Sequence, residues 1–208
     1  MAGTVFFSVS MSLDGYIAPD SPEELMGQQW MELQKWVFRQ RHFRENLKLG
    51  DGGEEGRDND IVRETFERTG ASVMGKRMFD AGEHAWPDDP PFHTPVFVVT
   101  HEERAPWERR GGTTFHFVND GIEAALERAR AAAGPRDVRI AGGATTIVQC
   151  LNAGLVDEFH VALSPVLFGR GIRLFDGVDP KRVVLELRDA EPSPRTTHLR
   201  YRVSRSPR

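Results

Sequence analysis

Apolar and polar positions along the chain follow two spacings, one typical of strands and the other of helices. Short runs of apolar or small residues, several of them bounded by glycine or proline, predict strands. These predicted strands cover residues 5–12, 71–74, 96–100, 114–118, 138–141 and 158–166. Apolar residues that recur every three or four positions predict helices over residues 30–49, 61–69, 121–133 and 145–153.

The order of these elements predicts the fold class. Strands alternate with helices through most of the chain, which is typical of an α/β fold with a central, mostly parallel sheet. Residues 182–187 and 198–203 are predicted to pair as an antiparallel hairpin at the C-terminal end. No internal repeat or linker interrupts this order, so residues 1–208 are predicted to form a single domain.

Composition narrows the class of protein. The chain has 27 basic and 31 acidic residues, a formal net charge of -4, which is not the charge of a general nucleic-acid binder. Its single cysteine, Cys150, fits a reducing compartment, and the apolar runs are too short to span a bilayer. We therefore expect a cytoplasmic protein with neither a nucleic-acid nor a membrane partner. The seven histidines have no metal-ligand spacing, so no metal site is predicted.

A pair of glycines stands where a strand is predicted to become a helix. Gly142 and Gly143 let the backbone turn sharply, and the helix after them presents free N–H groups to an anion. Ala144 is small, and the hydroxyls of Thr145 and Thr146 can add donors to a phosphate. The alternative is a tight turn with Thr145 as the helix N-cap.

Two further strand ends carry groups that suit a phosphate. Gly75 is followed by the cations Lys76 and Arg77, and arginine offers two parallel donors to an oxyanion. Thr100 and His101 follow the next strand. Because ligands of open α/β sheets gather at the carboxyl ends of the strands, three such ends together favour a dinucleotide. A solvated basic turn is the alternative for the first of them.

Small residues near the end of the first strand suit a flat ring, and so do aromatic residues of the predicted helix 30–49. Trp30, Trp36 and Phe43 either stack on such a ring or belong to the core. Residues 50–60, with four glycines and five acids, are predicted to form a mobile loop that closes over the substrate as part of a lid.

Four stretches of the chain resemble a known family. They read "SVSMSLDGYIA", "SVMGKRMFDAGE", "VFVVTH" and "VRIAGGATTIVQCLNAGLVDEFHVALSPVLFGRGIRLFD". In order and spacing they resemble the riboflavin-biosynthesis reductase (RibD C-terminal domain-like) family of the dihydrofolate reductase-like superfamily. Residues 20–60, which the resemblance does not cover, are interpreted as a variable insertion.

The resemblance implies a three-layer dihydrofolate reductase-like fold of about eight strands that binds NADPH across its sheet. The residues that match the cofactor-binding positions are Ser10, Ile17, Ala18, Gly75, Lys76, Arg77, Thr100, His101, Gly142, Gly143, Ala144, Thr145 and Thr146. The first three face the nicotinamide, and Thr100 and His101 lie near the adenosine 2′-phosphate. The related domains commonly form homodimers, which we also expect here.

The predicted function is NADPH-dependent hydride transfer to a small, flat heterocycle. The resemblance implies a reductase of dihydrofolate or of 5-amino-6-(5-phosphoribosylamino)uracil. Ala141 stands where riboflavin-pathway reductases typically carry a glutamate, and the catalytic candidates are limited to Asp14 and Glu32. The alternative is a non-catalytic NADP(H)-binding protein that kept the fold without the chemistry.

Overall fold

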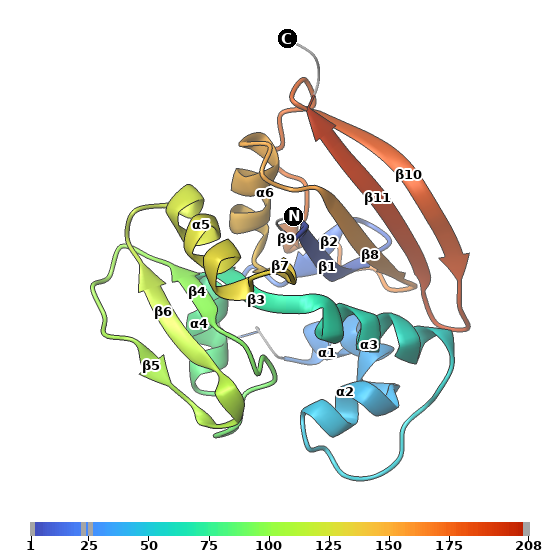
Figure 1. Ribbon diagram of the computed structural model, residues 1–208. Coiled ribbons are helices and arrows are strands. Elements are labelled where there is room, and N and C mark those ends of the chain that lie inside the picture. The colour runs from blue at the N-terminus through green and yellow to red at the C-terminus, as the bar shows by residue number, and fades with distance from the viewer. Residues whose placement is uncertain (1–2, 22–23, 25–26, 206–208) are drawn as a thin grey trace.

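A computed structural model describes residues 3–21, 24 and 27–205, and its centre is a nine-stranded sheet (Figure 1). The strand order is β10-β11-β8-β1-β7-β3-β4-β6-β5. The strands are β1 (Val5–Ser12), β3 (Thr69–Gly75), β4 (Val96–Val99), β5 (Trp107–Glu108), β6 (Thr114–Val118), β7 (Asp137–Gly142), β8 (Glu158–Ser164), β10 (Val183–Pro192) and β11 (Thr197–Arg205). The six strands from β8 to β6 are parallel to their neighbours, whereas β11, β10 and β5 pair antiparallel. The predicted α/β class is therefore confirmed.

Helices cover both faces of the sheet. The helices are α1 (Gln28–Gln34), α2 (Arg41–Asn46), α3 (Arg57–Arg68), α4 (Lys76–Glu83), α5 (Ile122–Ala133) and α6 (Ala144–Asn152). On one face, α5 and α6 bury the main apolar core against Phe7, Val73 and Ile140, with Cys150 inside it. On the other, Phe79 of α4 and Trp36, which follows α1, occupy separate apolar clusters. A cavity is left on this second face.

The predicted helix over residues 30–49 is wrong, because the structure divides this segment into three pieces. Between α1 and α2 lies the 3-10 turn η2 (Val37–Arg39), after which Gln40 adopts an extended conformation. The backbone next to Gln40 pairs with Glu54 instead of continuing the helix: Glu54 donates to the carbonyl of Arg39, and Arg41 donates to the carbonyl of Glu54. A contact distant in sequence thus overrides the helical spacing.

The predicted loop over residues 50–60 is also too long, because α3 already begins at Arg57. Asp58 and Asp60 lie in the first turn of that helix, where acidic side chains interact favourably with the helix dipole. In the sequence analysis, the same acids favoured the prediction of a loop. Glu54, in the remaining loop, forms ion pairs with Arg39 and Arg195.

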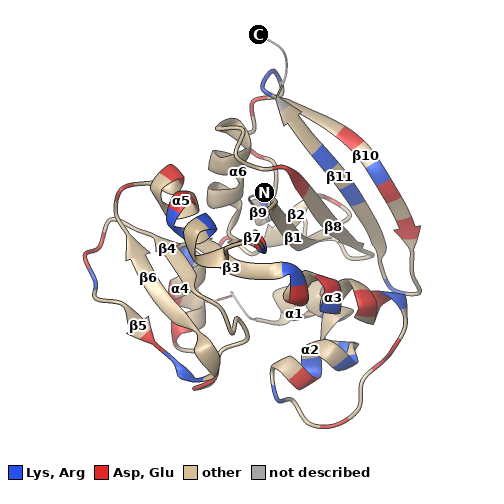
Figure 2. Cartoon of the chain, viewed as in Figure 1, with Lys and Arg blue, Asp and Glu red and all other residues tan. Residues whose placement is uncertain are grey.

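The C-terminal hairpin is confirmed, and it is longer than predicted. β10 and β11 pair from Val183 with Arg205 to Pro192 with Thr197. Acidic residues lie along β10, whereas the charged residues of β11 are basic (Figure 2). The short strands β5, β2 (Tyr16–Ala18) and β9 (Ile172–Arg173) were not predicted, because two or three residues carry no detectable alternation. Among the described residues, no helix has the length and apolar character that crossing a membrane requires.

Candidate functional site

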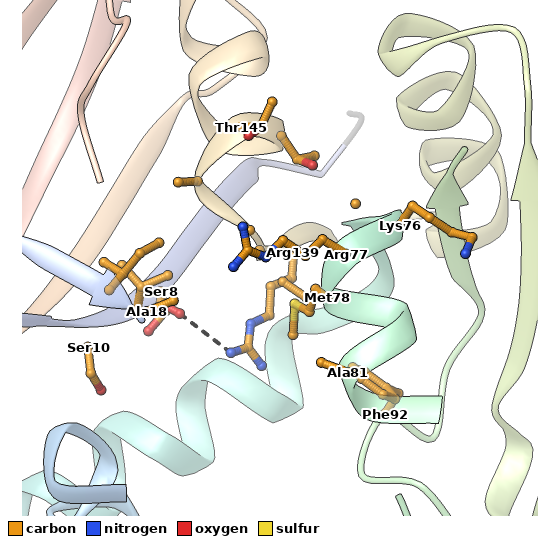
Figure 3. A pocket seen from close by; sticks show the side chains of 18 of the residues that line it. Ser8, Ser10, Ala18, Lys76, Arg77, Met78, Ala81, Phe92, Arg139 and Thr145 are labelled. Carbon is orange, nitrogen blue, oxygen red and sulfur yellow. Dashed lines mark hydrogen bonds between the residues drawn. The ribbon is translucent and has the colours of Figure 1, made fainter. Parts of the chain in front are cut away.

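A cavity of about 760 Å³ opens at the carboxyl ends of β7, β3 and β4. These three parallel strands are neighbours, so the turns that follow them lie side by side. All the residues predicted to bind the cofactor line this cavity: Ser10, Ile17, Ala18, Gly75, Lys76, Arg77, Thr100, His101, Gly142, Gly143, Ala144, Thr145 and Thr146. Figure 3 shows Lys76, Arg77 and Thr145 around one part of it, with Ser8, Ser10 and Ala18 on the opposite side.

The two glycines after β7 have different roles in the turn. Gly142 has φ +137°, which disfavours any side chain, and a Cβ there would lie 3.0 Å from the sulfur of Met78. Gly143 has φ -80°, and a Cβ there would meet no protein atom within 4 Å. Gly143 is also the N-cap residue of α6, in place of the predicted alternative, Thr145. Gly142 is therefore required by the backbone, whereas the free space beside Gly143 belongs to the cavity.

The turn after β3 packs against the turn after β7. A Cβ on Gly75 would lie 2.4 Å from the hydroxyl oxygen of Thr146, so only glycine allows this approach. Lys76 forms ion pairs with Asp80 and Glu102, and hydrogen bonds to these two groups raise its pKa. Arg77 donates to the backbone carbonyl of Asp20 at 2.5 Å. Both cations thus have protein partners at the edge of the cavity.

The strand end at Thr100 is held by its own hydrogen bonds. The Thr100 amide donates to the carbonyl of Val118, and its hydroxyl accepts from the Glu102 amide at 3.0 Å. His101 is exposed beside it. Glu102 is the one carboxylate among the described residues that line the cavity.

The opposite wall of the cavity is built from serines of β1 and from aromatic side chains. Trp36 donates from its indole nitrogen to the Ser10 hydroxyl at 2.9 Å, and that hydroxyl donates to Gln34 at 2.8 Å. Five aromatic residues of the segment from α1 to α3 line this wall: Trp30, Trp36, Phe38, Phe43 and Phe66. Trp30, Trp36 and Phe43 therefore both pack in the protein and face the cavity.

Arg139 is a cavity-lining residue that the sequence analysis missed. Its side chain extends from β7 toward Ser8, whose carbonyl oxygen lies 3.5 Å from Nη2 (Figure 3). Its guanidinium carbon lies 5.6 Å from the centre of the Phe66 ring. The Nε atom of Arg139 is buried without a hydrogen-bond partner, and its guanidinium group forms no ion pair among the described residues.

Arg139 is a cation inside an enclosed space. The side chain keeps some accessible surface because it lines the cavity, yet desolvation lowers its pKa to about 10. It therefore remains charged at neutral pH. Its position two residues before Ala141, on the same face of the strand, is the sequence signal that could have indicated it.

A chain of hydrogen bonds behind the cavity was also missed. The Ser8 hydroxyl lies 2.9 Å from Nδ1 of His160, and Nε2 of His160 lies 2.9 Å from Nδ1 of His198. Nε2 of His198 lies 2.9 Å from a carboxylate oxygen of Asp58. We call these four residues the serine relay. Burial, followed by the charge of His198, lowers the pKa of His160 to about 3.

The two catalytic candidates of the sequence lie outside the cavity. Asp14 accepts hydrogen bonds from the Ser12 hydroxyl and from the amides of Phe168 and Gly169. Desolvation raises its pKa, but these hydrogen bonds outweigh that effect and lower it to about 2. Glu32 forms an exposed ion pair with Lys35. Asp14 thus anchors a loop. Among the described residues, no group of three His, Cys, Asp or Glu is placed to hold a metal ion.

The uncharacterized protein YyaP of Bacillus subtilis (strain 168) is 39% identical over 109 residues, which are 50% of this chain and 57% of that relative. The match thus spans little more than half of the relative's length.

Solved structures share the fold across the whole chain. A putative riboflavin biosynthesis protein from Shewanella sp. PV-4 has a TM-score of 0.66 at 22% identity, covering 99% of this chain and all of that one. Dihydrofolate reductase from Enterococcus faecalis, solved in complex with NADP(H) and RAB-propyl, has a TM-score of 0.53 at 13% identity, covering 98% of each chain. The family model described as the RibD C-terminal domain matches residues 3–199. The chain therefore belongs to the RibD C-terminal domain family.

Proposed function

We propose that the protein is an NADPH-dependent reductase that transfers a hydride to a small, flat heterocycle of the pterin or pyrimidine type. The observation that carries this proposal is the meeting of three phosphate-compatible turns at one end of a cavity whose other wall is aromatic. A reductase-type fold supports the same reaction class. Bound NADPH would supply the hydride, and the chain would position the two reactants.

The glycine turn fits the diphosphate of this cofactor. The free space beside Gly143 allows an oxyanion to approach the backbone closely, and the first turn of α6 offers unpaired N–H groups. Thr145 is exposed at the same place and can donate from its hydroxyl.

The 2′-phosphate of NADPH is assigned to the edge formed by Lys76, Arg77, Thr100 and His101. Lys76 already has two acidic partners there, Asp80 and Glu102, so its charge is partly compensated. The preference for NADPH over NADH then depends on whether the attraction of Lys76, Arg77 and His101 for the phosphate exceeds the repulsion from Glu102. Charge-assisted hydrogen bonds of about 1.5–3 kcal/mol each favour the phosphate.

The substrate is assigned to the aromatic wall. Trp36 and Phe43 offer flat faces, and Ser10 and Gln34 offer polar atoms near the edge of a ring. Arg139 supplies a cation without a carboxylate partner among the described residues, which suits a carbonyl oxygen or an acidic substituent of that ring.

The proposal is tested by following NADPH oxidation in the presence of 7,8-dihydrofolate and of 5-amino-6-ribosylaminouracil 5′-phosphate. NADPH that carries deuterium at the transferred position should deliver it to a carbon atom of the product. Consumption of NADPH without deuterium in the product would contradict direct hydride transfer.

A second candidate function is NADP(H) binding without reduction. It is favoured by the position of Asp14 and Glu32 outside the cavity, which leaves Glu102 as its one carboxylate among the described residues. Tight NADPH binding with no turnover of any heterocycle would support this second function over the first.

We also propose a homodimer. Exposed apolar side chains lie on the edge strand β10, at Val184, Leu185 and Leu187. Sedimentation at micromolar concentration should give twice the chain mass of 23.4 kDa. A monomer that persists at that concentration would contradict the dimer.

A further inference from the structure

The serine relay connects the interior of the protein to the cavity. Its four residues come from four elements: Ser8 from β1, His160 from β8, His198 from β11 and Asp58 from the first turn of α3. Ser8 and His160 are direct partners in the parallel register, and His198 is diagonal to His160, two residues along β11 from Arg200, the direct partner of His160. Side chains on one face of adjacent strands are close enough to contact each other. The sheet therefore holds the relay in place.

The interior of the relay is buried, whereas its Ser8 end is accessible from the cavity. His198 is fully buried, and His160 and Asp58 expose less than a tenth of their surface. Ser8 is partly accessible and lines the cavity (Figure 3). At the other end, Asp58 also accepts a hydrogen bond from the Ser193 hydroxyl at 3.1 Å. Trp36 packs edge-on against His198 with 5.1 Å between the ring centres, which closes the side of the relay.

Two arrangements of protons satisfy every contact in the relay without moving a heavy atom. In the discharged arrangement, both rings are neutral: Ser8 donates to His160, His160 donates from Nε2 to His198, and His198 donates to Asp58. In the loaded arrangement, His198 carries a proton on each nitrogen. It then donates to His160, which donates from Nδ1 to Ser8, and the Ser8 hydroxyl proton points into the cavity.

We propose that the serine relay delivers the proton that completes reduction of the heterocycle, with Ser8 as the residue that donates it to the substrate. This inference rests on the proposed reductase function. It supplies the acid that Asp14 and Glu32, both outside the cavity, do not supply.

The step balances as follows. Bound NADPH would supply the hydride to the carbon of a C=N bond and would itself be oxidised, which would leave an electron pair on the ring nitrogen. That nitrogen takes the proton of the Ser8 hydroxyl while Ser8 takes the Nδ1 proton of His160. His160 in turn takes the Nδ1 proton of His198, which is left neutral and hydrogen bonded to Asp58. A proton from solvent, with reorientation of the groups, restores the loaded arrangement.

Charged groups from neighbouring elements surround the two rings of the relay. Three cations act on His160: Arg200 from β11, Arg139 from β7 and Arg57 from α3. Among the described residues, the carboxylate that forms a hydrogen bond with a histidine of the relay is that of Asp58, and its partner is His198. Since burial and these cations keep His160 neutral, His160 passes a proton on and does not retain one.

The first test reads the histidines directly and needs neither cofactor nor substrate. In the full chain labelled with ¹⁵N-histidine, NMR between about pH 5 and 9 reports the tautomer of each ring. The relay predicts that His160 changes from an Nε2 proton to an Nδ1 proton within this range, as the discharged arrangement gives way to the loaded one. Asp58→Asn should abolish this change of tautomer. A His160 that keeps one tautomer throughout overturns the proposal.

The second test uses 7,8-dihydrofolate as the probe in single turnovers with NADPH. Ser8→Ala should slow reduction about 100-fold, leave NADPH affinity unchanged and remove the ionisation of the relay from the pH profile. Ser8→Thr, which keeps the hydroxyl, should restore most of the rate. Reduction by Ser8→Ala at the wild-type rate overturns the relay. If the wild-type protein does not oxidise NADPH with this probe, the failure concerns the proposed function, and the NMR result still decides the relay.

Discussion

The two walls of the cavity are built in different ways. The wall assigned to the cofactor consists of backbone turns, and glycines at Gly75 and Gly142 are required there by close contacts and by a positive φ. The wall assigned to the substrate consists of side chains from distant segments, among them Trp36 and Arg139. A substitution on the first wall therefore changes the backbone conformation of the turns. A substitution on the second acts mainly on what the cavity can hold.

The largest expected effect is a difference in stability between substitutions of two adjacent glycines on the cofactor wall. Gly142→Ala introduces a Cβ at φ +137° and 3.0 Å from the sulfur of Met78, so it should lower the free energy of unfolding by about 2–3 kcal/mol. Gly143→Ala is the matched control and should change that free energy by less than about 0.5 kcal/mol. Urea unfolding of both variants measures the difference, and equal stabilities would show that the turn is not constrained in this way.

The next effect concerns the buried histidine behind the substrate wall. Because the pKa of His160 is lowered in the folded protein to about 3, the unfolded chain takes up a proton first as the pH falls. Stability is therefore retained above the ordinary histidine pKa and lost below it, by on the order of 2 kcal/mol at about pH 5.

Unfolding measured from neutral pH to pH 5 checks this dependence, and His160→Gln should flatten it. His84→Gln, which makes the same replacement at an exposed histidine, is the matched control. A slope that survives in His160→Gln would assign the acid sensitivity to other groups.

A smaller effect tests whether the two walls act independently. Trp36→Phe removes the indole hydrogen bond to Ser10, so unfolding should become easier by about 1 kcal/mol. NADPH affinity should stay the same, whereas the KM for the reducible heterocycle should rise. Trp107→Phe, which alters a tryptophan outside the cavity, is the control for both titrations. Loss of NADPH affinity in Trp36→Phe would mean that the walls are coupled.

The smallest expected effect lies at the edge assigned to the 2′-phosphate. Glu102→Gln removes a carboxylate that competes for Lys76, so NADPH should bind about two- to three-fold more tightly and NADH should be unaffected. The gain is small because the Glu102 side chain is 63% exposed and its charge is screened. Equal changes for the two cofactors would place the 2′-phosphate elsewhere.

The same contrast explains what the sequence could predict. Glycine at Gly143, the cations after Gly75 and the strand ends are local patterns, and all the residues they indicated line one cavity. The central strands were likewise predicted within a few residues of their observed bounds. In each case the physical cause lies within a few positions along the chain.

The substrate wall depends on contacts that no local pattern contains. The helix predicted over residues 30–49 is broken because the backbone on either side of Gln40 pairs with Glu54. His160 and His198 are 38 residues apart and become neighbours only through the β8–β11 register. Arg139 interrupts an apolar strand, and that interruption is the local sign of a functional side chain in this wall.

The most direct test of the central assignment is calorimetric titration of NADPH into the wild-type protein and into Gly143→Val, with unfolding of both measured alongside. Gly143 has φ -80°, outside the left-handed region, and a Cβ there would meet no protein atom within 4 Å, but a valine side chain would fill the space assigned to the diphosphate. We predict that the variant unfolds like the wild type and binds NADPH at least about 100-fold more weakly. A folded Gly143→Val variant that binds NADPH with wild-type affinity would contradict the assignment of this cavity to the cofactor.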